Sequence, residues 1–135
     1  MLRLLLPFLL LCALSLNMTA QGNKEFPART EWLEKWDNSK AYTMEALTSI
    51  PDDKLTFRPT ESQMSTQEQI QHIAGNIYGL SRRFLDYQPD SFDEEALSKM
   101  LSAETLSRKE LTNLLSDAYA YGATAIKNLP KERWE

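Results

Sequence analysis

Three segments of this sequence repeat apolar residues at the three- and four-residue spacing of an amphipathic helix, and this spacing constrains the fold most. They are residues 30–50, 65–87 and 107–129. Pro51 and Pro130 directly follow the first and third, where helices end because the residue before proline is driven out of the α region. The sequence has no alternating strand pattern. It therefore predicts an all-α fold in which three long helices pack as an antiparallel bundle.

Capping boxes mark the expected helix starts. In such a box a serine and a glutamate three residues later each satisfy a backbone N–H of the other residue. The pattern occurs at Ser65 with Glu68, at Ser91 with Glu94, and at Ser107 with Glu110. The middle box predicts a short helix that ends at Leu101.

Residues 51–64 contain two prolines and no helical period, so we expect a loop between the first two long helices. Leu55 and Phe57 are the large apolar side chains in its first half. We expect both to be buried against the end of the bundle.

The amino terminus has the layout of a secretory signal. Arg3 precedes the apolar run Leu4–Leu16, and a small-residue cleavage site follows at Ala20. Residues 1–20 are therefore predicted to be removed, which leaves a polar leader at 21–29 and a bundle domain at 30–135. An uncleaved anchor and a lipoprotein acylated at Cys12 are the alternatives, and a leucine before Cys12 disfavours the second. The prediction is a secreted or periplasmic protein without a membrane segment after cleavage.

The 115 residues left after cleavage suffice for one small domain. Arg3 is the only charged residue removed, so the formal net charge falls from −4 to −5. Phosphate contact requires clustered basic residues, and we expect no nucleic-acid partner. The pairs Arg82-Arg83 and Arg108-Lys109 are interpreted as solvated surface. Cys12 leaves with the signal, which excludes disulfides and thiolate sites from the mature chain.

A family resemblance rests on the tryptophan-containing first helix, the loop PDDKLTFRP at residues 51–59, and the pattern from Ser65 through Glu68 to His72. In this order the chain resembles the DinB-like proteins over most of its mature length. The resemblance implies a four-helix bundle related to bacillithiol transferases and mycothiol-dependent enzymes. It also implies a divalent metal, nickel, zinc or iron, held by three histidines, one of which stands where His72 stands here.

The chain departs from that family pattern at its carboxyl end. It contains no second histidine, and it stops shortly after Pro130, where the link to a fourth helix is expected. We therefore expect a C-terminally truncated bundle of three long helices and a short one. The implied function is a metal-dependent hydrolase or thiol transferase whose site is incomplete, with His72 the single candidate ligand. As written, the chain is expected to be inactive. The alternative is a non-catalytic bundle that binds a partner, or forms a homodimer, through the surface left by the missing helix.

The helical wheel places His72 about 140° from the centre of the apolar stripe. This position favours an exposed, hydrogen-bonded imidazole. Glu68, one turn earlier, can share an ion with His72, but the capping box already uses its carboxylate. Gly75 and Gly79 lie on the same side, and each glycine costs about 1 kcal/mol relative to alanine in a helix. Either another backbone approaches closely there, or two surface glycines are tolerated.

The remaining aromatic candidates are interpreted as packing residues. Trp32 and Trp36, and also Tyr119 and Tyr121, are expected to anchor the bundle rather than to bind a ligand. For Trp134 two interpretations stay open. It begins a further packed element, or it folds back on the core.

Overall fold

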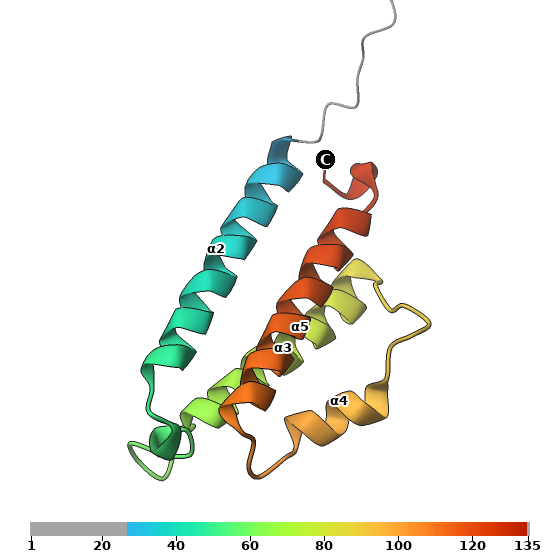
Figure 1. Cartoon of the computed structure of the whole chain (residues 1–135). Coiled ribbons are helices and arrows are strands. Elements are labelled where there is room, and N and C mark those ends of the chain that lie inside the picture. Colours follow the sequence, from blue (N-terminus) through green and yellow to red (C-terminus); the bar gives the residue numbers. More distant parts are fainter. Residues whose placement is uncertain (1–26, 135) are drawn as a thin grey trace, which may run out of the picture.

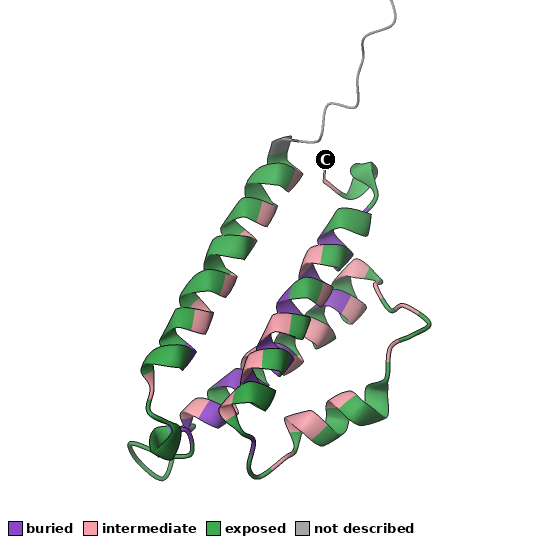
Figure 2. Cartoon of the chain, in the orientation of Figure 1, coloured by how far each residue is buried: buried purple, intermediate pink, exposed green. Residues whose placement is uncertain are grey.

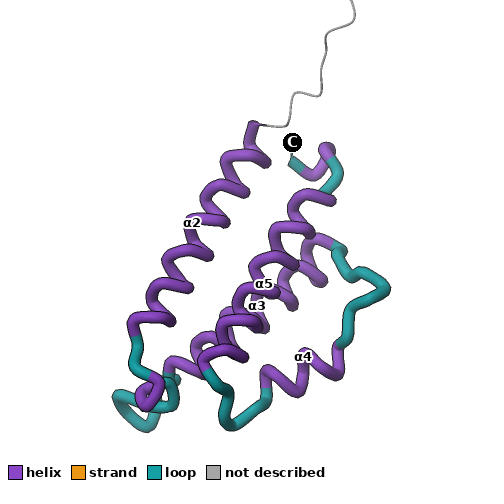
Figure 3. Tube along the Cα trace, viewed as in Figure 1, coloured by secondary structure: helices purple, strands orange, loops and turns teal. Residues whose placement is uncertain are grey.

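The structure is a computed structural model that describes residues 27–134, and in this range it contains helices and loops but no strand (Figure 3). The helices are α2 (Pro27–Ser49), α3 (Thr66–Leu85), α4 (Glu94–Leu101) and α5 (Arg108–Asn128), with single 3-10 turns at Asp52–Lys54 and Lys131–Arg133 (Figure 1). The predicted all-α bundle of three long helices and one short helix is confirmed. The predicted signal peptide and most of the leader lie outside the described residues.

Two of the three predicted capping boxes form. The Ser65 N–H donates to Glu68 Oε2 at 2.7 Å, and the Ser107 N–H donates to Glu110 Oε2 at the same distance. The box at Ser91 is wrong, because α4 begins at Glu94 with Asp93 as its N-cap. The Asp93 carboxylate accepts the Ala96 N–H at 2.8 Å. Aspartate caps a helix as well as serine does. Ser91 instead lies in the preceding turn, in which the Phe92 N–H donates to Pro89 O at 2.9 Å.

Helix α2 runs antiparallel to α5, as predicted. Hydrogen bonds across this interface pair rising residue numbers in α2 with falling residue numbers in α5, as in Arg29 with Leu129 O, Trp36 with Tyr119 O, and Lys40 with Ser116. The start of α2 therefore lies beside the end of α5 (Figure 1).

Helix α3, in contrast, runs parallel to α5. The Gln67 side chain at the start of α3 reaches the Leu106 N–H just before α5, and Asp86 after α3 pairs with Arg133 after α5. The uniformly antiparallel arrangement that the sequence predicted is wrong for this pair. Residues 86–107, which link α3 to α5 and include α4, carry the chain back along one side of the bundle (Figure 1). Such a long crossover lets sequential helices run parallel.

The core lies around α5, which packs against both α2 and α3 (Figure 2). Its most deeply buried large side chains are Leu47, Leu111 and Leu115. Leu55 joins this core as predicted, with 4% of its surface exposed, but Phe57 is 59% exposed. Leu55 is held at the bundle end because its carbonyl accepts the Gln67 N–H at 2.8 Å, whereas Phe57 lies in an exposed turn in which its N–H donates to Lys54 O at 3.1 Å. None of the helices within residues 27–134 has the length and apolar character needed to cross a bilayer.

Candidate functional site

The main candidate site is an apolar groove between α2 and α3, with α5 as its floor. Its volume is about 420 Å³. Trp32 and Trp36 of α2 form one wall, and the other wall comes from one flank of α3. The lining residues that α3 and α5 contribute are Ile73, Asn76, Ile77, Leu80, Ser81, Phe84, Leu85, Tyr119, Gly122 and Ile126.

This α2–α3 groove exposes several large apolar side chains. Trp32 is 38% exposed, Leu80 53% and Phe84 54%. Both walls pack on α5, and none of the helices within residues 27–134 lies between them (Figure 2). A contiguous apolar surface of this kind marks an interaction site or an aggregation hazard.

Trp36 closes the base of the groove and explains a glycine in α5. Its indole N–H donates to Tyr119 O at 2.9 Å, and its ring stacks on Trp32 at 5.0 Å between centroids. A Cβ on Gly122 would lie 2.6 Å from the Trp36 ring. At Gly122 the Trp36 side chain of α2 therefore lies directly against the backbone of α5. Trp36 therefore packs against the core as predicted, whereas Trp32 lies on the exposed wall of the groove.

His72 lies on α3 with its imidazole exposed, as its helical position predicted. Its Nε2 lies 3.0 Å from the side-chain nitrogen of Asn76, which lines the groove. Glu68 does not join His72. It accepts the Ser65 N–H and pairs with Arg58, and that backbone hydrogen bond is the main cause that lowers the pKa of the Glu68 carboxyl.

The donor set around His72 does not fit a metal ion. Structural and catalytic metal sites in proteins need three or four converging ligands, and His72 has only an amide beside it. Within residues 27–134 no group of three or more His, Cys, Asp or Glu side chains converges as a metal site would. The ligand assignment of His72 therefore remains a prediction that rests on the resemblance.

The two helical glycines near His72 have different surroundings. A Cβ on Gly75 would lie 3.4 Å from the Leu101 side chain of α4, whereas none of the atoms described lies within 4 Å of that position on Gly79. The neighbour of Gly75 is therefore the short helix. Gly79 is a tolerated surface glycine.

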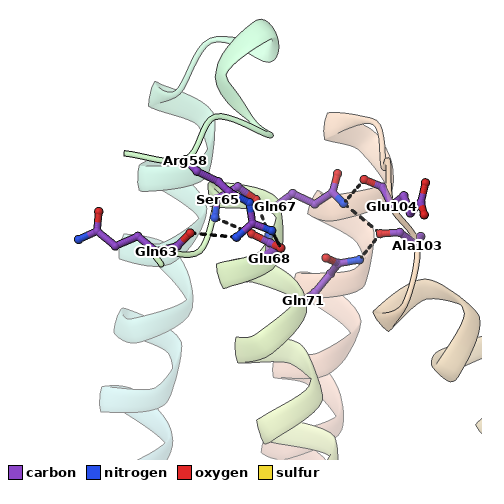
Figure 4. A network of polar contacts seen from close by, with 8 residues as sticks. All are labelled: Arg58, Gln63, Ser65, Gln67, Glu68, Gln71, Ala103 and Glu104. Atoms are coloured by element: carbon purple, nitrogen blue, oxygen red, sulfur yellow. Dashed lines mark hydrogen bonds and ion pairs between the residues drawn. The ribbon is translucent and has the colours of Figure 1, made fainter. Parts of the chain in front are cut away.

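A buried glutamine pair at the start of α3 was not predicted from the sequence (Figure 4). The Gln67 amide donates to the carbonyls of Ala103 and Glu104, and its oxygen accepts the Leu106 N–H at 2.9 Å. Gln71, one turn later, donates to the carbonyls of Met100 and Ala103. This glutamine clamp fixes the loop between α4 and α5. Its only signal was the spacing of two glutamines beside the apolar stripe.

Arg108 was predicted to be solvated and is not. Its guanidinium pairs with Asp52 and donates to the carbonyls of Leu47 and Ile50, which end α2. A cation suits these carbonyls because the carboxyl end of a helix carries a partial negative charge. Arg108 is therefore a structural residue that joins α5 to the end of α2.

Four aromatic rings gather on the other flank of α3, beside α4. Tyr78, Phe92 and Tyr87 all contact the ring of Tyr121. The Tyr121 hydroxyl donates to Tyr87 O at 2.5 Å. Burial, followed by the charge of Asp117, raises the pKa of Tyr78 to about 12.

The other two aromatic candidates also pack on the bundle. Tyr119 has its hydroxyl 3.0 Å from Ser39 and 3.1 Å from Thr43, so it anchors α2 as predicted. Trp134 folds back toward the start of α2, where the Arg29 guanidinium lies 5.8 Å above its ring. Tyr119 also lines the α2–α3 groove, whereas Trp134 lies outside it.

Comparison of the chain with known protein families, with curated proteins and with solved structures found no match.

Proposed function

We propose that this protein is a DinB-like bundle that acts as a binding module, and that it accepts an additional amphipathic helix in the α2–α3 groove. The groove carries this proposal. It is as long as the α3 segment from Ile73 to Phe84, which is about 17 Å at the rise of an α-helix. A helix laid there would cover Trp32, Leu80 and Phe84 and would complete a four-helix arrangement around the core.

A second copy of the chain is the occupant that we would test first. Two copies that face each other across a two-fold axis would bury the same apolar residues on both sides. We therefore expect the chain from Gln21 onward to self-associate. Sedimentation equilibrium over a range of concentrations measures this association.

Phe84→Asp places a charge in the groove, and its matched control is Phe57→Asp, since Phe57 has a similar exposure of 59% against 54% but lies outside the groove. We expect Phe84→Asp to abolish association and Phe57→Asp to leave it unchanged. A wild-type chain that stays monomeric at all concentrations, or equal behaviour of the two variants, refutes dimerisation through the groove.

A metal-dependent hydrolase or thiol transferase is the second candidate, and it is supported by the DinB-like resemblance and by the position of His72 one turn from the groove-lining Asn76. A helix in the groove would lie beside the imidazole. The further ligands would have to come from that helix, because the described residues do not supply them. We expect zinc and nickel titrations of the monomer to show no tight site. Submicromolar binding that is lost in His72→Ala would overturn this expectation.

A further inference from the structure

A second cavity lies on the opposite flank of α3, under the connection that contains α4. It has a volume of about 440 Å³ and is bounded by α3, by residues 89–100 and by α5. It shares no lining residue with the α2–α3 groove. Its size is within the range of small-molecule sites.

Three aromatic rings line this α4 cavity, and each contacts the other two. Ring centroids are 4.8 Å apart for Tyr78 and Tyr121, 5.5 Å for Phe92 and Tyr121, and 5.8 Å for Tyr78 and Phe92. The rings are inclined to each other by 51° to 55°. Tyr121 is held in place by the hydrogen bond from its hydroxyl to Tyr87 O. The three rings therefore pack against one another and form one continuous aromatic patch on the lining of the cavity.

The charge on the lining of the cavity is entirely negative. Asp93 and Asp117 are its charged residues, and no lysine or arginine is among its lining residues. The Asp93 carboxylate caps α4 by accepting the Ala96 N–H. Asp117, exposed on α5, is therefore the main counter-charge for a ligand.

The aromatic cluster already holds a cation of the protein itself. The Arg82 guanidinium lies 5.0 Å from the centroid of the Phe92 ring, and it pairs with Glu94 at 3.1 Å. Aromatic rings attract cations because the ring face carries negative charge. The Phe92 ring also lines the cavity, and there Tyr121 and Asp117 provide a second pair of ring and carboxylate.

We propose that the α4 cavity binds a small organic cation with an alkylammonium group, which lies against the cluster of Tyr78, Phe92 and Tyr121 and is neutralised by the Asp117 carboxylate. A quaternary or methylated ammonium suits this lining, because such a cation needs no hydrogen-bond acceptor for each proton. The field of Asp117 reaches the cavity, since its charge contributes to the raised pKa of Tyr78.

Choline is the probe, and its control is the uncharged isostere in which a carbon replaces the nitrogen. Proton NMR titration of the full chain follows the ring signals of the tyrosines and of Phe92. We expect saturable shifts of these signals with choline and binding of the isostere that is about tenfold weaker. Equal binding of the two compounds overturns the proposal, because apolar contact alone would then explain it.

Asp117→Asn and Phe92→Leu test the two parts of the site, with Asp53→Asn as the control at the far end of the bundle. We expect each of the first two to weaken choline binding at least about fivefold and the control to leave it unchanged. Circular dichroism verifies that each variant is folded. An unchanged affinity in folded Asp117→Asn overturns the proposal.

A second readout is independent of affinity. A bound cation near Asp117 should lower the pKa of Tyr78, which tyrosinate absorbance in an alkaline titration measures with and without choline. Choline that binds only to scattered surface carboxylates leaves this titration unchanged and contradicts the assigned site. The outcome does not depend on self-association through the groove.

Discussion

The two flanks of α3 differ in a way that their sequences do not suggest. The flank toward α4 contributes polar residues and glycine, yet Gln67 and Gln71 there are 2% and 7% exposed. The flank toward α2 carries Leu80 and Phe84, which are more than half exposed. Polar residues are thus buried near the start of α3, and apolar residues are exposed near its end.

The path of the chain explains this inversion. Residues 86–107 return over the polar flank, and their carbonyls and the Leu106 N–H supply partners for both glutamines. No described element crosses the apolar flank between α2 and α3. Polar groups can be buried where partners exist, while an uncovered apolar flank predicts a binding partner. Each prediction below tests one side of this comparison.

Gln67→Leu should have the largest effect on stability. Leucine leaves the buried Leu106 N–H and the carbonyls of Ala103 and Glu104 without the Gln67 amide, so we expect a loss of about 3 kcal/mol in the free energy of unfolding. Urea denaturation measures it. Gln69→Leu, on the exposed side of the same helix, is the control and should change stability by less than about 0.5 kcal/mol. Similar losses in both variants would show that the clamp does not stabilise the buried flank.

Gly122→Ala tests the base of the open groove. The new methyl group would meet the Trp36 ring, whose indole is fixed by its bond to Tyr119 O. Overpacking of this kind costs about 2 kcal/mol. Thermal and urea unfolding, together with tryptophan fluorescence, measure the loss and the displacement of Trp36.

The matched control for that substitution is Gly79→Ala, where the methyl group has open space. It should stabilise the chain by about 0.8 kcal/mol, because alanine is the better helix former. If both substitutions stabilise the chain, the Trp36 ring moves without cost. The close approach of α2 to α5 then does not require a glycine at Gly122.

Tyr78→Phe tests the buried flank through pH. The pKa of Tyr78 is raised from 10 to about 12, so its contribution to stability is fully present below pH 10 and is lost as the pH rises toward 12. The unfolded state releases the phenolic proton more readily in this window. We therefore expect the variant to lose less stability than the wild type between pH 10 and 12.

Denaturation curves across that range provide the measurement, with the exposed Tyr42, replaced by phenylalanine, as the control. If the loss of stability between pH 10 and 12 persists in Tyr78→Phe but disappears in Tyr42→Phe, the phenol responsible is Tyr42, and the assignment to Tyr78 is wrong.

Phe84→Gln should have the smallest effect on the stability of the monomer. Its side chain is 54% exposed, so little burial is lost and we expect a change within about 0.5 kcal/mol. Urea denaturation at a concentration where the chain is monomeric checks this. A loss above about 2 kcal/mol would show that the open wall already has a stabilising partner within the chain.

Local sequence was sufficient for the helices and for two of their starts. The capping boxes at Ser65 and Ser107 form because their partners lie three residues away. The exposed position of His72 also follows from helical period alone. Phe57 and Arg108 were misjudged because their environments depend on where distant segments end. The direction of α5 relative to α3 was missed for the same reason, since a crossover and a tight turn leave similar local patterns.

The sequence by itself therefore determined an all-α chain, the approximate extent of its three long helices and the polar side of α3 on which His72 lies, because these depend on contacts within a few residues. Only the tertiary structure decided which flank of α3 is covered, that two glutamines are buried, and that Trp36 needs a glycine opposite it. Those features arise where residues far apart in sequence meet. The apolar period of one helix does not specify which segment of the chain packs against it.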